Sequence, residues 1–107
     1  MAIVDLVFLP EDFALGITAE PIEGLNMEDY SFEVEVFSSS SKRLRLKKEE
    51  LIRDSENTYI AAIHSPDLGV GPVRCRVIAR IPDNKFEGGE RVDIDEFKTN
   101  IQIVKQL

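Results

Sequence analysis

Hydrophobic and polar residues alternate with a period of two along most of the chain, and most regularly between Gly71 and Asp83. On one face of this segment lie Val73, Cys75, Val77, Ala79 and Ile81. Three arginines lie on the other face, with Ile78 as the single apolar residue among them. This alternation predicts a strand with one face in a core and the other in water. A Gly-Pro pair before it and a Pro-Asp pair after it are expected to mark its ends.

The same alternation predicts further strands at residues 13–20, 30–38, 43–48, 58–63 and 91–104. The segment 49–54 fits either one helical turn or a short strand. Within 91–104 the apolar phase slips at Asp95-Glu96, which predicts a bulge or a tight reversal there. About seven short strands separated by turn signals predict an all-β, single-domain β-sandwich, with a small barrel as the alternative.

Charge patterning predicts which strands are neighbours. If the loop of four serines closes a hairpin, Glu35 lies opposite Arg45, and Glu33 lies opposite Lys47. Opposite charges in such positions favour strand pairing by about 0.2–1 kcal/mol. The arginines of the most regular strand would repel the basic strand but attract the acidic one. We therefore expect the acidic strand between the other two, and the serine loop to be flexible and exposed.

Length and net charge restrict the classes of partner. A chain of 107 residues is one domain that can bury roughly 65% of its unfolded surface. A net charge of −7 repels nucleic acid and anionic lipid unless a basic face is segregated, so neither partner is expected. The only basic run consists of Lys42, Arg43, Arg45, Lys47 and Lys48. It has no interleaved aromatic residues for base stacking, which favours a charged outer sheet face; carbohydrate or polyanion binding is the alternative.

Residues that could carry catalysis are few. His64 is the only histidine, and no nucleophile stands at a recognisable spacing from it. Cys75, the only cysteine, falls on the inward face of its strand, so we expect it to be buried and unreactive. The glycines around Val70 lack the third glycine and the helix of a phosphate-binding loop, and predict a turn. We expect no enzyme activity, no cofactor and no metal.

The first nine residues form an apolar arm before a domain at residues 10–107. Its candidate interface residues are Ile3, Val4, Leu6, Val7, Phe8 and Leu9. Both alternating faces are apolar, so the arm must be covered, either by its own sandwich or by a second molecule. We expect a protein partner or self-association, and so a homo-oligomer. The segment lacks the features of a secretory signal, which predicts a cytoplasmic product at synthesis.

Several turn and strand patterns together resemble a known family. They are Glu11-Asp12-Phe13, the strand from Tyr30 to Phe37, and Leu68-Gly-Val-Gly71 leading into the strand that ends at Ile81-Pro82-Asp83. This combination resembles the immunoglobulin-like modules at the N-termini of phage and prophage tail or baseplate proteins. The resemblance implies an immunoglobulin-like sandwich with a structural role in a virion, attaching other parts to the particle, and with no catalytic residues.

Overall fold

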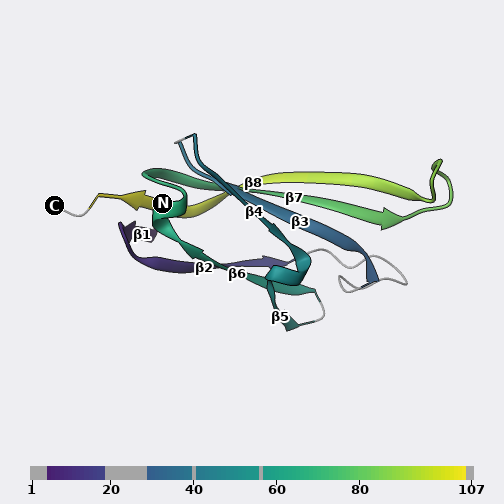
Figure 1. The fold of residues 1–107 in the computed structure, drawn as a ribbon, viewed down its shortest axis with the longest axis horizontal. Helices are drawn as coiled ribbons and strands as arrows, with labels where there is room; N and C mark the ends of the chain where they lie inside the picture. The colour runs from purple at the N-terminus through teal and green to yellow at the C-terminus, as the bar shows by residue number, and fades with distance from the viewer. Residues whose placement is uncertain (1–4, 19–28, 40, 56, 106–107) are drawn as a thin grey trace.

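The computed structural model describes residues 5–18, 29–39, 41–55 and 57–105, and within them the chain is all-β, without an α-helix (Figure 1). Two short 3-10 helices, η2 (Lys48–Glu50) and η3 (Ser65–Asp67), connect strands. The strands are β1 (Asp5–Phe8), β2 (Asp12–Thr18), β3 (Ser31–Phe37), β4 (Arg43–Lys47), β5 (Ile52–Ser55), β6 (Thr58–His64), β7 (Gly71–Pro82) and β8 (Glu90–Val104).

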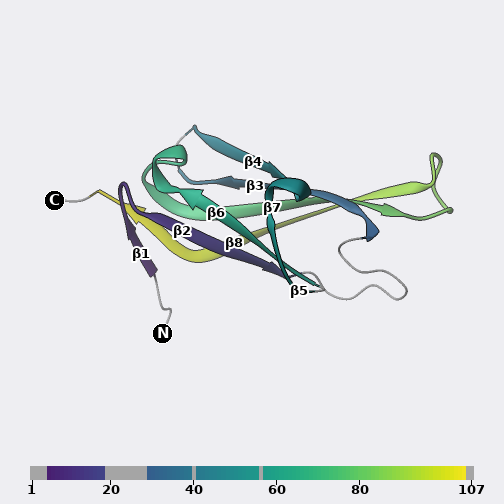
Figure 2. The ribbon, with the colours of Figure 1, turned by 60° about the horizontal axis from the view of Figure 1, so that its bottom comes forward.

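The strands form two sheets. One has five strands in the order β1-β8-β7-β3-β4, and the other has three in the order β2-β6-β5. β1 pairs with β8, so strands from opposite ends of the sequence lie side by side. This pair is parallel, whereas the other pairs are antiparallel. Figure 2 shows that β7 and β8 curve strongly alongside β2 and β6 and run nearly straight beyond them.

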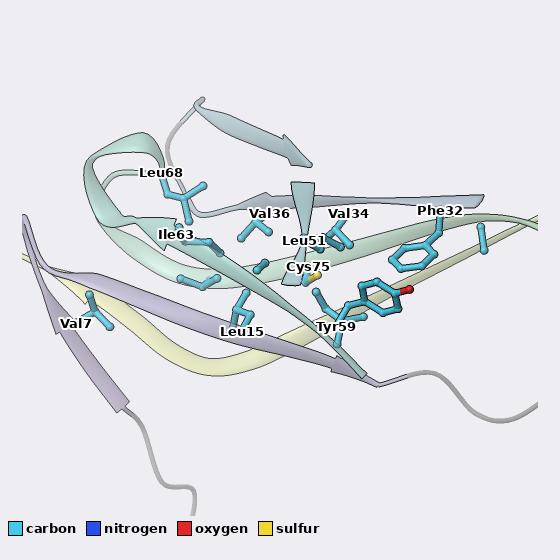
Figure 3. Close-up of a cluster of buried hydrophobic side chains, with 14 of the residues drawn as sticks. Val7, Leu15, Phe32, Val34, Val36, Leu51, Tyr59, Ile63, Leu68 and Cys75 are labelled. Atoms are coloured by element: carbon cyan, nitrogen blue, oxygen red, sulfur yellow. The ribbon is translucent and has the colours of Figure 1, made fainter. Parts of the chain in front are cut away.

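One hydrophobic cluster draws buried side chains from both sheets (Figure 3). From the five-stranded sheet come Val34, Val36, Val73, Cys75 and Ile103, each with a relative exposure of 0%. From the three-stranded sheet, Ile63 and Tyr59 point into the same space, and the Tyr59 ring meets Phe32 edge-on at 5.1 Å. In the strands that supply this core, alternation therefore does what the sequence predicts, because the apolar face makes the core.

The predicted neighbours of the acidic strand are confirmed. β3 lies between β4 and β7, and its hairpin with β4 pairs Glu35 with Arg45 and Glu33 with Lys47. The uncertain segment 49–54 contains both alternatives, because it holds the end of η2, then Leu51, then most of β5. Residues 19 and 20, at the end of one predicted strand, lie outside the described residues.

The bulge predicted at Asp95-Glu96 is wrong. These residues stay in regular register opposite β7, and the irregularity lies further along, where Pro72 pairs with Gln102 but Arg74 pairs with Lys98. There the Thr99 hydroxyl donates a 2.8 Å hydrogen bond to the backbone oxygen of Val73. The side chains of residues 92–98 are exposed on both faces of the strand. Because neither face is buried there, apolar residues can change from one face to the other without a change of register.

The serine loop is also less exposed than predicted. Ser38 is buried, and its hydroxyl donates a 2.8 Å hydrogen bond to the backbone oxygen of Leu68. This bond satisfies the buried hydroxyl, which would otherwise lack a partner. It also links the β3–β4 connection to the connection between β6 and β7.

The described part of the N-terminal arm is an edge strand of the chain's own sheet. Val7 is buried beside Ile103, and Leu9 donates its backbone N–H to the Val104 oxygen at 2.9 Å. Leu6 and Phe8 point to the outer face, where they are 53% and 43% exposed. Ile3 and Val4 lie outside the described residues. No helix of the described chain is long and apolar enough to cross a membrane.

Candidate interaction surface

The strands β7 and β8 extend well beyond the other strands as a two-stranded ribbon, seen at the right of Figure 1. The molecule is accordingly elongated, at 53 × 29 × 27 Å. β1 pairs with β8 only from Ile101 onward, and β3 flanks β7 only as far as Arg80. We call residues 76–98 the β7–β8 hairpin. β3 still pairs with β7 from Arg76 to Arg80, so only the end of this hairpin, residues 81–91, projects as two strands alone. Two strands alone are marginally stable in water, which favours contact of this end with another surface.

Large apolar side chains are exposed on this hairpin. Val92 and Ile94 lie on the outer face at 52% and 59% exposure, and Phe97 lies on the opposite face at 41%. Phe86, in the loop at the hairpin tip, is 51% exposed. Apolar side chains that gather on both faces of one projecting element are typical of a surface that binds another protein.

Ion pairs and turns hold the hairpin tip in one conformation. Arg91 Nη1 lies 2.9 Å from Asp83 Oδ2, and the backbone N–H of Lys85 donates to the other oxygen of that carboxylate at 3.0 Å. The hydrogen bond from Lys85, followed by the one from Arg91, lowers the pKa of Asp83. Gly88 and Gly89 take φ values of 89° and 78°, which a residue with a side chain rarely adopts. The exposed apolar side chains therefore lie on a hairpin whose tip is fixed by these contacts.

The outer face next to the hairpin is an ion-pair network centred on Glu35. Its carboxylate lies 2.7 Å from Arg43, 3.1 Å from Arg45 and 3.4 Å from Arg76, and its side chain is only 10% exposed. Burial by itself raises the pKa of Glu35, but hydrogen bonds from Arg43 and Arg45 outweigh it, and the pKa lies below its ordinary value. The guanidinium groups of Arg43 and Arg76 also stack over the Phe37 ring, at 4.6 Å and 5.6 Å from its centroid.

The structure therefore engages most of the basic run within the chain. Besides the arginines bound to Glu35, Lys42 donates to the Pro66 oxygen and Lys48 to the Tyr30 oxygen, at 3.1 Å and 2.9 Å. Lys47 borders a surface cavity of about 400 Å³, whose lining side chains carry both signs of charge. The lining residues are Ser31, Phe32, Glu33, Lys47, Glu49, Ile78 and Arg80. A mixed lining of this kind gives no net attraction for a polyanion.

An exposed Asp12–His64 pair is a feature that the sequence did not reveal. Strand pairing between β2 and β6 sets these two residues opposite each other, and His64 Nδ1 lies 2.6 Å from Asp12 Oδ1. The hydrogen bond with Asp12 raises the pKa of His64. The neighbouring Ser65 hydroxyl is buried and has no partner among the described residues. No cluster of three metal-binding side chains occurs in the described chain.

Cys75 is buried in the middle of β7, as the sequence predicted. Burial raises the pKa of its thiol to about 11, so the thiolate is scarce at neutral pH.

No protein-family model matches the chain, and no match was found among curated proteins or solved structures. The hairpin and the charged outer face are thus the features on which a functional argument rests.

Proposed function

We propose that this chain is a non-enzymatic module for protein–protein assembly, which binds a protein partner through the β7–β8 hairpin. The observation that carries the proposal is the exposure of Val92, Ile94 and Phe97 on the β7–β8 hairpin, whose end extends beyond the other strands. Burying such side chains at an interface removes apolar surface from water at about 25 cal/mol per Å². The exposed Leu6 and Phe8 of β1 would add to the contact area at the other end of the sheet.

The proposed fold is an immunoglobulin-like β-sandwich. The neighbours β8-β7-β3-β4 and β2-β6-β5 follow the order of the G-F-C-C′ and B-E-D strands of such domains, which supports the assignment. Cys75 stands on the strand equivalent to F, where antibody domains carry one cysteine of their inter-sheet disulfide, but this chain has no second cysteine. Only the resemblance described above supports a setting in a phage or prophage tail or baseplate.

Binding of a carbohydrate or another polyanion is the competing role. It would need cations that are available to the ligand, whereas Arg43 and Arg45 already bind Glu35. An anionic ligand would therefore have to displace a buried carboxylate of like charge. This observation favours assembly over polyanion binding.

The test is lysine-specific cross-linking in cells that naturally produce the chain, followed by mass spectrometry. We expect intermolecular cross-links from Lys85 and Lys98, which flank the exposed apolar residues of the hairpin. The double variant Val92→Ser/Ile94→Ser should lose them, whereas Val70→Ser, at an apolar position outside the hairpin that is 42% exposed, should keep them. Cross-links that persist in the double variant, or a chain that stays monomeric in cells and binds sulfated polysaccharide through Arg43 and Arg45, would overturn the proposal.

A further inference from the structure

The outer edge of β8 between Glu90 and Asn100 has no strand partner among the described residues. β7 covers one edge of β8, and β1 reaches the other edge only from Ile101 onward. Side chains from residue 92 to residue 98 are exposed on both faces of the ribbon. A strand that is open along one edge and exposed on both faces is a template for adding another strand.

Charge on this strand selects among the ways in which two copies could pair. In antiparallel pairing about a two-fold axis, residues at equal distances on either side of the centre lie opposite each other. Centres at Asp93, Asp95 or Glu96 set an acidic residue opposite its own copy. A centre at Ile94 sets Asp93 opposite Asp95, again with like charge. Of the centres from 93 to 97, which give the longest overlaps within the open edge, only the one at Phe97 avoids every like-charge pair.

The register centred on Phe97 also joins opposite charges. Glu96 of each copy lies opposite Lys98 of the other, so the ion pair occurs twice about the axis. Inside one chain Lys98 pairs across the ribbon with Arg74, a like charge, and makes no ion pair with any described residue. A second copy would thus supply the anion that Lys98 lacks. At the centre, the half-exposed Phe97 rings would meet each other.

We propose that two copies of this chain associate through antiparallel pairing of their β8 edges, with Phe97 on the two-fold axis. This inference rests on the proposed assembly function and names a second copy as the partner of the hairpin. The five-stranded sheets of the two molecules then continue into each other. Because the overlap is short, the dimer is weak and forms at high local concentration, as in an assembled particle.

Sedimentation of the purified chain from about 10 µM to about 1 mM tests the dimer, since small interfaces associate in this range. We expect Lys98→Glu to raise the dissociation constant by about tenfold, because two attractive pairs become repulsive. Its unfolding midpoint should not fall, since the change places an acid opposite Arg74. Adding Glu96→Lys to that variant restores the complementary pair and should restore dimerisation. The same change removes the 3.2 Å ion pair of Glu96 with Arg76 inside the chain, so the unfolding midpoint of the double variant is measured alongside its association. Lys85→Glu, the same charge change at the hairpin tip, is the matched control.

Cross-linking through new cysteines tests the register itself. Two cysteines at position 97 would lie opposite each other on the axis, within reach of a disulfide. Because Cys75 lies opposite Phe97 on β7, both variants are made in a Cys75→Ala background, which removes the intrachain disulfide. Phe97→Cys should then form covalent dimers under mild oxidation much faster than Ile94→Cys, although Ile94 is the more exposed residue. Equal rates for the two variants, a monomer throughout the concentration range, or no effect of Lys98→Glu would overturn the dimer. Hairpin-dependent cross-links to a different protein in cells would then still support the assembly function.

Discussion

Glu35 lies directly opposite Arg45 in the β3–β4 hairpin, and its carboxylate accepts a 3.1 Å hydrogen bond from the Arg45 guanidinium. The other carboxylate oxygen lies 2.7 Å from Arg43 and 3.4 Å from Arg76. One carboxylate on the central strand thus binds cations from both neighbouring strands. The network fixes the order of three strands, because acidic or basic residues on all three would repel one another.

Replacing Glu35 by Gln should destabilise the fold at neutral pH. Because Arg43 and Arg45 are about half exposed and can be solvated once released, we expect the free energy of unfolding to fall by about 1 kcal/mol. Urea titration at pH 7 measures it. Glu87→Gln, in the exposed hairpin loop, is the control and should change the midpoint little. If both variants unfold at the same urea concentration as the parent chain, the network does not stabilise the fold.

The same carboxylate predicts the direction of an acid effect. In the fold the pKa of Glu35 is below its ordinary value of 4.5, so its contribution to stability is complete above that pH. The contribution is lost as the pH falls through the lower pKa of the folded state. The difference in unfolding midpoint between the parent chain and Glu35→Gln should therefore shrink between pH 5 and the folded-state pKa. A difference that stays constant over this range would contradict the assignment.

Strand positions and neighbours could be predicted from sequence because alternation of apolar and polar residues shows the buried face of each strand, and opposite charges on two strands favour their pairing. Alternation placed Cys75 inside, and the Glu35–Arg45 pair gave the register of the hairpin. The lengths of β7 and β8 agree with the predicted strands, but the projection of their paired ends beyond the other strands could not be predicted, since strands that extend into solvent follow no burial constraint. The same freedom explains the error at Asp95-Glu96. The Asp12–His64 contact depends on pairing between distant segments, for which the sequence held no signal.

Cys75 should resist thiol reagents in the native chain. It is fully buried, and the pKa of its thiol is about 11, so labelling requires the chain to open. We expect the rate of reaction with a coloured disulfide reagent at pH 8 to be at least about a hundredfold below that of the urea-unfolded chain. Ile94→Cys, with an exposed second thiol, shows the rate for an accessible site. Native labelling of Cys75 at the unfolded rate would show that the core is open around β7.

Gly71 is required by its backbone conformation and by a close contact. Its φ is 136°, and a methyl group there would lie 2.8 Å from the backbone nitrogen of Ser39. Gly71→Ala should therefore destabilise the chain by about 1–3 kcal/mol. Gly16→Ala is the matched control, because no atom lies within 4 Å of the added methyl. Thermal unfolding of the two variants compares them, and equal midpoints would show that the loop around Ser39 yields without cost.

In the described part of the N-terminal arm, one side chain contributes to the core and its neighbour lies on the surface. Val7 points into the core at 9% exposure, whereas Leu6 beside it is 53% exposed on the outer face. Removing two buried methyl groups in Val7→Ala should cost about 1–2 kcal/mol, and Leu6→Ala should cost much less. Urea midpoints of the two variants measure the difference.

A chain that begins at Pro10 extends the same prediction. It lacks Val7 and also the hydrogen bond from the Leu9 N–H to the Val104 oxygen, and it leaves one edge of β8 open at that end. We expect it to unfold at a clearly lower urea concentration than the full chain, because an edge strand that buries a core side chain contributes to the fold. If the shortened chain is as stable as the parent but associates less, β1 acts mainly as an intermolecular contact, and Leu6 and Phe8 become its contact residues.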